Sequence, residues 1–147
     1  LRARVAGAVL MVQREVADRL AASPGGRDYG VLAALLGAAY SVEFVRAVPT
    51  TVFWPRPEVA SAVVKLVPAA TAWGEEEYRR YRNTVKALFG QRRKKVGTLL
   101  RAIGGMTADE AAALAARAGL DPASRPETLG VAQLRGLAAA LGERSAP

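Results

Sequence analysis

The chain has 147 residues with 51% hydrophobic content, so it can bury a core as one domain or two small ones. It contains neither cysteine nor histidine, which excludes disulfides, thiolate or imidazole zinc sites, cysteine nucleophiles and histidine-based triads. Its net charge of +8 favours a polyanionic partner. No apolar run approaches the roughly 20 residues that span a bilayer, and no signal-peptide pattern opens the chain. We therefore expect a cytoplasmic protein that binds no metal and no membrane.

The first expected strand is a continuous apolar run, Ala8 to Val12, that ends at Gln13. Uninterrupted apolar residues are typical of a strand covered on both faces, as in a parallel α/β sheet. Only Val42 to Val48 and Ser61 to Val67 are further strand candidates, and three strands make a poor doubly covered sheet. We therefore expect the chain to be a piece of a larger protein whose earlier strands are missing.

Two helices are expected between the first and second strands. The first runs from about Arg14 to Ala22 and ends at a turn-forming cluster, Ser23 to Gly26. The second, from about Asp28 to Tyr40, places its larger apolar residues on one stripe. Glu15 and Asp18 on the first helix are expected to face solvent and not to form an acid/base pair. The order of elements is consistent with the closing half of a sheet that ends antiparallel.

An aromatic and proline-rich segment, Phe53 to Pro57, precedes the third strand. Its two prolines remove two backbone donors and fix φ at about −65°, which excludes a helix or a central strand and predicts a stiff loop. The β-branched run Ser61 to Val67 predicts a buried strand that anchors this loop. Such a loop is suited to hold a flat ligand; an equal alternative is that Phe53 and Trp54 cap the edge of a core.

After Pro68 the pattern changes to helices alone. Residues 69–73 suit a linker, and Glu75 to Glu77 favour a helix start through the macrodipole. Thr107 and Glu110 form a capping box. Glycines end the helices, so we expect four that run to Phe89, to Gly104, from Thr107 to Gly119, and from Val131 to just before Gly142.

The positive charge is concentrated in one segment. From Arg79 to Arg101 there are nine Lys or Arg residues and no Asp or Glu. Such a block suits a phosphate backbone, because each cation can displace condensed counterions. The alternative is a solvated helix face, on which acidic residues are normally interspersed. The candidate phosphate-binding residues are Arg79, Arg80, Arg82, Lys86, Arg92, Arg93, Lys94 and Lys95.

Several segments resemble the motifs of one family. They are Leu10 to Ala17 at the sheet, Asp28-Tyr29-Gly30, Phe53 to Val64 with the form F-x-P-x-P-x-V-x-S-x-V-V, Leu88 to Lys95, and Leu120-Asp121-Pro122 through Arg125, Glu127 and Leu129. Their order and spacing resemble the ribosomal RNA small-subunit adenine dimethyltransferases. These are the kasugamycin-sensitivity enzymes, which are related to the erythromycin-resistance rRNA methylases. The resemblance covers nearly the whole chain.

The resemblance implies an α/β fold: residues 1–68 would close a Rossmann-like S-adenosylmethionine-dependent methyltransferase sheet, residues 69–73 would be a linker, and residues 74–147 a small all-α RNA-binding domain. The family methylates the N6 amines of two adjacent adenines in a hairpin near the 3′ end of 16S rRNA. Its glycine-rich cofactor loop, ribose-binding acid and catalytic motif lie upstream of Ala8. We therefore expect S-adenosylmethionine to be bound mainly by the absent part, and this fragment alone to be inactive.

The resemblance also implies roles for residues that are present. Phe53 would stack on the flipped target adenine, a contact worth roughly 1–3 kcal/mol. Gln13 and Arg14, at the end of a strand, would support the site. Trp54 receives no role. The basic candidates would bind phosphates of the small-subunit rRNA in the 30S subunit, which sets affinity and placement but not base identity. We expect the protein to be a monomer.

Three alternatives stay open. The chain could be a non-catalytic RNA-binding or ribosome-assembly module on a methyltransferase scaffold. It could belong to a large-subunit rRNA adenine methylase, although the segment Asp121 to Leu129 favours the small-subunit branch. A DNA-binding helical protein would explain the charge but not the half of the chain that contains the strands.

Overall fold

The computed structural model describes residues 6–70 and 72–144. The chain divides into two compact units, of which unit 1 comprises Leu1–Ser23 and Arg27–Ala72, and unit 2 comprises Pro24–Gly26 and Trp73–Pro147. The expected domains, residues 1–68 and 74–147 with a linker at 69–73, stay a prediction, because a domain is a part of the chain that can fold on its own. Across the described residues, every helix is too short or too polar to cross a bilayer.

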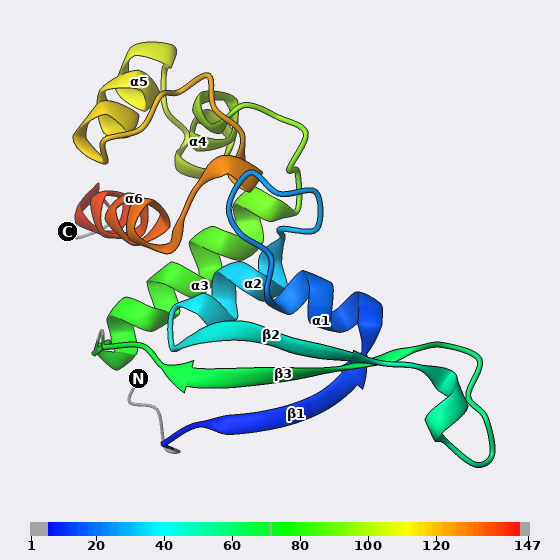
Figure 1. Ribbon diagram of the computed structural model, residues 1–147. Helices are drawn as coiled ribbons and strands as arrows, with labels where there is room; N and C mark the ends of the chain where they lie inside the picture. The colour runs from blue at the N-terminus through cyan, green and yellow to red at the C-terminus, as the bar shows by residue number, and fades with distance from the viewer. Residues whose placement is uncertain (1–5, 71, 145–147) are drawn as a thin grey trace. The chain divides into compact units, whose positions relative to one another are not determined.

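Unit 1 contains a three-stranded sheet in the order β1-β3-β2 (Figure 1). The strands β1 (Ala8–Gln13), β2 (Tyr40–Val48) and β3 (Ser61–Pro68) correspond to the three expected runs. Both outer strands are antiparallel to β3. Gln13 pairs with Ser61 and so does Val48, so all three strands meet at the end where β3 begins.

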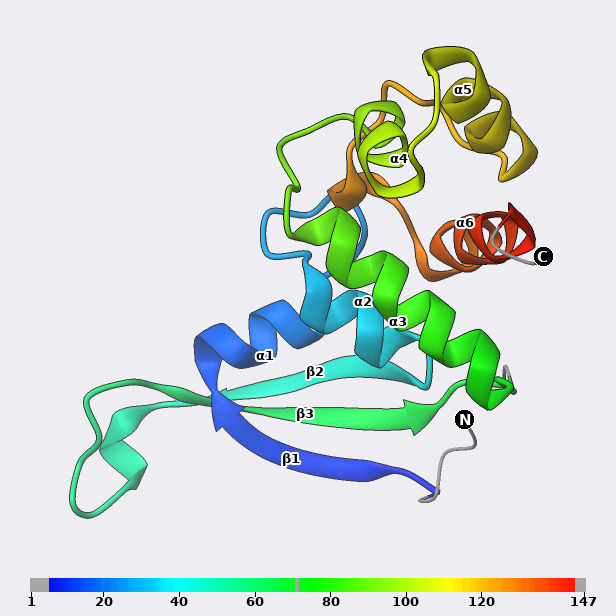
Figure 2. The ribbon, with the colours of Figure 1, turned by 180° about the vertical axis from the view of Figure 1, so that it is seen from behind.

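Two helices, α1 (Arg14–Leu20) and α2 (Val31–Gly37), cover one face of this sheet, as the opposite views in Figures 1 and 2 show. Side chains alternate across a strand, and in β3 the alternate residues Ala62, Val64 and Leu66 are buried under the helices. Ala17 of α1 packs against them. The prediction of a buried anchoring strand is confirmed for this face of β3.

Strand β1 forms where it was expected, but it is not covered on both faces. Among its residues Val9 is 68%, Leu10 43% and Met11 57% exposed. The strand lies at the edge of the sheet, and among the described residues the helices of unit 1 lie over one face alone (Figure 2). The apolar run therefore remains largely in contact with solvent in this chain.

Unit 2 is built from the helices α3 (Glu75–Phe89), α4 (Val96–Gly104), α5 (Ala108–Arg117) and α6 (Val131–Arg144). Its core contains the buried apolar residues Tyr81, Val85, Leu88, Val96, Leu99, Leu100, Leu114, Leu134 and Leu137. Ile103 near the end of α4 is exposed, while Met106 just beyond the helix is buried. One detail differs from expectation. Helix α6 continues through Gly142 to Arg144, because a single glycine costs a helix only about 1 kcal/mol relative to alanine.

The helix ends in unit 2 follow the local rules. Thr107 accepts a hydrogen bond from the Glu110 amide at 3.3 Å, and the Glu110 carboxylate accepts one from the Thr107 amide at 2.8 Å, which confirms the capping box. The hydrogen bond from the Thr107 amide to the carboxylate is the main cause that holds the pKa of Glu110 below its ordinary value. Gly105 and Gly119 end helices with φ of 60° and 67°, a conformation that glycine adopts without strain. In Pro24–Gly26, the Gly25 amide donates to the Glu127 carbonyl at 2.7 Å.

An aromatic and charged cluster joins the start of α3 to α6. The Glu77 carboxylate accepts hydrogen bonds from Arg135 Nε at 2.6 Å and from the Gly74 amide at 3.2 Å. The Arg135 guanidinium lies 4.4 Å from the ring centroid of Trp73, which is buried and packs on Tyr81 at 4.7 Å. Partial desolvation raises the pKa of Glu77, but the hydrogen bonds outweigh it and hold the pKa below its ordinary value.

We expect Glu77→Gln to lower the thermal stability of the protein at neutral pH, by about 0.5–1 kcal/mol for a partly exposed pair. Because the folded-state pKa of Glu77 is depressed, its contribution is present above the unfolded-state pKa and is lost as pH falls through the folded-state pKa. The stability difference between wild type and variant should therefore shrink on acidification. Thermal unfolding monitored by circular dichroism across that pH range checks this.

Glu76→Gln is the matched control, since it removes the same charge from the same turn of α3. Glu76 pairs with Arg79 at an exposed site, where ion pairs contribute little. An equal loss of stability in both variants would contradict the role assigned to Glu77.

Candidate nucleic-acid interface

The end of the sheet brings Gln13 and Arg14 beside the proline-rich loop. Strand β1 ends at Gln13 and α1 begins at the next residue. Gln13 lies opposite Ser61, the first residue of β3, and the Arg14 amide donates to the Ala60 carbonyl at 2.9 Å. The two residues predicted to support the site are thus joined to the base of the loop that carries Phe53.

The loop between β2 and β3 extends beyond the strands (Figure 1). A short 3-10 turn, Thr50–Val52, precedes Phe53, and no strand or helix includes Phe53 to Pro57, as predicted. Arg56 Nε donates to Thr50 Oγ1 at 2.9 Å across the loop. Phe53 is half-buried and Trp54 is exposed, so only Phe53 fits the alternative in which the pair caps a core edge.

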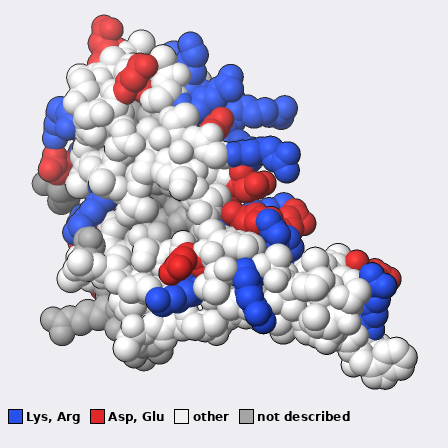
Figure 3. Space-filling model, viewed as in Figure 1, with Lys and Arg blue, Asp and Glu red and all other residues white. Residues whose placement is uncertain are grey.

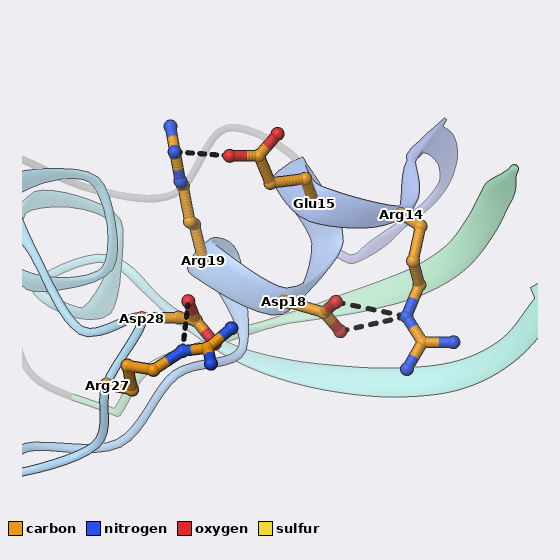
Figure 4. Close-up of polar contacts among 6 residues, drawn as sticks. All are labelled: Arg14, Glu15, Asp18, Arg19, Arg27 and Asp28. Atoms are coloured by element: carbon orange, nitrogen blue, oxygen red, sulfur yellow. Dashed lines mark hydrogen bonds and ion pairs between the residues drawn. The ribbon is translucent and has the colours of Figure 1, made fainter. Parts of the chain in front are cut away.

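A shallow hollow of about 450 Å³ lies at this end of the sheet, lined by Gln13, Arg14, Glu15, Asp18, Arg27, Asp28, Val59 and Ala60. Its charges are paired (Figure 4). Arg14 Nε donates to the two Asp18 carboxylate oxygens at 3.0 and 3.1 Å, and Arg19 pairs with Glu15. The Arg14 guanidinium also lies 4.7 Å from the Phe44 ring centroid. Glu15 and Asp18 are therefore each paired with an arginine of the same helix. They do not form an acid/base pair with each other.

The basic candidates of unit 2 lie on two adjoining elements. Four project from α3, and all of them are exposed: Arg79, Arg80, Arg82 and Lys86. The other four, Arg92, Arg93, Lys94 and Lys95, are exposed in the turn that follows Gly90. Figure 3 shows basic side chains gathered where this turn joins α3 to α4. The four charges of the turn are all basic, whereas Arg79 on α3 forms an ion pair with Glu76. The assignment of these residues to phosphate binding stays a prediction.

The turn that carries Arg92 to Lys95 is held by the segment Asp121 to Leu129. The first two amides of α4, at Val96 and Gly97, donate to the carbonyls of Ser124 at 2.8 Å and Pro122 at 2.9 Å. A Cβ at Gly97 would lie 3.1 Å from Pro122 Cβ, so the close approach favours glycine. No sequence pattern indicates this contact, although both segments contain motifs that carry the family resemblance.

Gly142 also lies at a close approach, in this case to the side chain of Arg80. An added Cβ at Gly142 would lie 2.8 Å from Arg80 Cδ, so the glycine inside α6 leaves room for this side chain.

The described residues contain no group of three or more acidic side chains that could hold a metal ion.

A family model described as ribosomal RNA adenine dimethylase matches residues 2–135. The chain belongs to this family. Its resemblance to the family, based on motifs in the sequence, is thereby confirmed. Two relatives named ribosomal RNA small subunit methyltransferase A are similar to it: one from Anaeromyxobacter sp. (strain K), 46% identical over 95% of this chain, and one from Desulfitobacterium hafniense (strain DSM 10664 / DCB-2), 37% identical over 93%. The chain spans about half of these relatives, 49% of each.

Two solved structures share the fold of this dimethylase-family chain. A dimethyladenosine transferase from Plasmodium falciparum superposes with a TM-score of 0.71 at 20% identity, over 89% of this chain and 55% of the other. The 23S rRNA methyltransferase ErmE superposes with a TM-score of 0.65 at 22% identity, over 92% and 55%. At these identities the likeness shows the α/β fold alone, which confirms the expected fold class at that level.

We expect the double variant Arg92→Glu, Arg93→Glu to weaken binding of a 16S rRNA hairpin roughly tenfold or more at low salt, because two phosphate contacts become repulsive. The slope of log affinity against log salt should become shallower by about 2. Fluorescence-anisotropy titrations of the chain at several salt concentrations measure both quantities.

Arg46→Glu with Lys65→Glu is the matched control, since it makes the same change in net charge at exposed positions of the strands, outside the basic segment. If both double variants lose the same affinity, the turn is no preferred phosphate site and net charge alone explains binding.

Proposed function

We propose that this chain is the carboxyl-terminal part of an S-adenosylmethionine-dependent rRNA adenine N6,N6-dimethyltransferase that acts on the small ribosomal subunit. Its substrate would be two adjacent adenines in a hairpin near the 3′ end of 16S rRNA. The observation that carries this proposal is the family match over residues 2–135, together with the shared names of the relatives.

The described residues do not fit the methyl donor. Dinucleotide and nucleoside cofactors in such folds are held by a glycine-rich turn between a strand and a helix. Here β1 passes into α1 at Gln13-Arg14 with no intervening loop. Since the chain spans about half of its relatives, we assign S-adenosylmethionine and the groups that accept hydrogen bonds from the adenine amine to the other half.

The sheet supports such a division of the enzyme. We propose that it is the closing part of a Rossmann-like sheet, which continues past β1 when the other half is present. In support of this, β1 pairs on one edge with β3, and its apolar residues Val9, Leu10 and Met11 are exposed. Exposed apolar surface of this kind marks an interface.

The residues of this chain would position the base. An adenine amine is a weak nucleophile, so the enzyme has to hold the flipped base in one geometry. Phe53 supplies a flat surface on a loop stiffened by Pro55 and Pro57. Gln13 and Arg14 hold the end of that loop where it enters β3. Gln13 pairs with Ser61, and the Arg14 amide donates to the Ala60 carbonyl at 2.9 Å. Their role in the reaction would be orientation.

The basic surface would place the rRNA. Phosphate contacts set register and orientation without reading bases, and the turn Arg92 to Lys95 concentrates four cations. A non-catalytic RNA-binding module is the second candidate, since the described residues contain this surface but do not fit the cofactor. The two are separated by assaying the complete parent protein, because the module would bind the hairpin without transferring methyl groups.

In the complete parent enzyme we expect Phe53→Ala to lower the rate of methyl transfer by about 10- to 100-fold, the value of one base–aromatic contact, while RNA affinity changes little. The measurement is transfer of labelled methyl groups from S-adenosylmethionine to the 16S rRNA 3′ hairpin, with a 23S rRNA hairpin as the competing substrate. Phe53→Tyr should keep most of the activity.

Thr51→Ala, an exposed position on the same loop, serves as control and should behave as wild type. Wild-type turnover of Phe53→Ala would remove the stacking role. Transfer to the 23S hairpin alone, or to neither RNA by the wild-type parent, would overturn the proposed function itself.

A further inference from the structure

Trp54 is 96% exposed at the tip of the β2–β3 loop. Figure 3 shows the end of this loop as a projection of uncharged atoms with basic and acidic atoms beside it. Isolated apolar residues on a surface are common. An indole is unusual there, because it is the largest apolar side chain and its loop is stiffened by prolines on either side of Arg56.

Trp54 and Phe53 cannot share one ligand. The backbone at Phe53 is extended, with φ of −110° and ψ of 149°, and successive side chains of an extended chain point to opposite sides. Phe53 is accordingly half-buried while Trp54 is in solvent. A base stacked on Phe53 would leave the indole uncovered, so a ligand of Trp54 would be a separate group.

The surroundings of Trp54 indicate the chemistry of that ligand. Arg56 Nε donates to Thr50 Oγ1 at 2.9 Å, which uses one of the five guanidinium donors and fixes the group on the loop. Among the described residues Arg56 forms no ion pair. Arg56 lies two residues from the exposed aromatic face and Glu58 two residues further on, with no ion pair between them. An aromatic face near a guanidinium that forms no ion pair suits a flat group that carries a negative charge, as a nucleotide does.

We propose that Trp54 stacks on a second unpaired nucleobase of the RNA substrate, on the opposite side of the loop from the base held by Phe53, with Arg56 at a neighbouring phosphate. The inference rests on the proposed function, since it takes the ligand to be RNA. Every base has a π-face, so the contact tolerates any sequence. Trp54 would therefore select single-stranded over paired RNA and fix the position of the strand, not the identity of the base.

The test uses Trp73→Phe, which leaves Trp54 as the one tryptophan of the chain. We expect its emission to be strongly quenched when a hairpin with an unpaired purine loop binds, and little changed by a fully paired duplex of equal length. Trp54→Ala in the wild-type chain should weaken hairpin binding about tenfold without changing duplex binding. Trp54→Phe should recover most of the loss.

Two controls keep the result clear. Val52→Ala removes exposed apolar surface from the same loop and should leave hairpin affinity unchanged. If Trp73→Phe does not fold, acrylamide quenching of the wild-type chain replaces it, because Trp54 is accessible whereas Trp73 is only 5% exposed. The quenchable fraction should then disappear when the hairpin is bound.

The outcomes separate the two proposals. Hairpin binding that is unaffected by Trp54→Ala, or emission quenched equally by hairpin and duplex, overturns the stacking inference and leaves the proposed function standing. Loss of self-association in Trp54→Ala with unchanged RNA affinity would assign the tip to a protein contact, which also overturns it. Absence of binding to any RNA at low salt overturns the inference and the RNA-binding role together.

Discussion

Strand β3 is hydrogen-bonded along both of its edges, and the geometry of unit 1 depends on that pairing. Because β1 and β2 are both antiparallel to it, the end of β1, the end of β2 and the start of β3 come to one place. The proline-rich loop leaves from β2 and returns into β3 there. Without the register of Gln13 against Ser61, Arg14 would not reach Ala60, and the loop would have no fixed base.

In unit 2, backbone contacts hold the turn that carries the four cations Arg92 to Lys95. Four adjacent positive charges repel one another and contribute nothing to a core. Their backbone is instead held by neighbours: α3 ends at Gly90, the Lys94 amide donates to the Gln91 carbonyl at 2.9 Å, and α4 begins against Pro122 and Ser124. The stability of this surface therefore comes from backbone contacts, so its side chains remain open to a ligand.

Structure that depends on contacts between residues close in sequence could be predicted, whereas structure that depends on contacts between distant segments could not. Thr107 with Glu110, Gly105, and the prolines around Arg56 act over a few residues, and each produced the expected local structure. The exposure of Met11 depends on what lies beside β1, and no local pattern reports that. The contacts of Gly97 with Pro122, and of Gly142 with Arg80, join segments distant in sequence. Local elements were therefore predictable from the sequence, but the long-range contacts that hold the candidate site were not.

The exposed strand β1 bears on the tendency of the isolated chain to aggregate. The run Ala8 to Val12 is apolar and uncharged, contains no proline, and has one edge unpaired by any strand in the described ranges 6–70 and 72–144. Such edges recruit strands from other copies, and short uncharged β segments stack into cross-β fibrils. We therefore expect intermolecular sheet growth from this strand when the isolated chain is stored at high concentration.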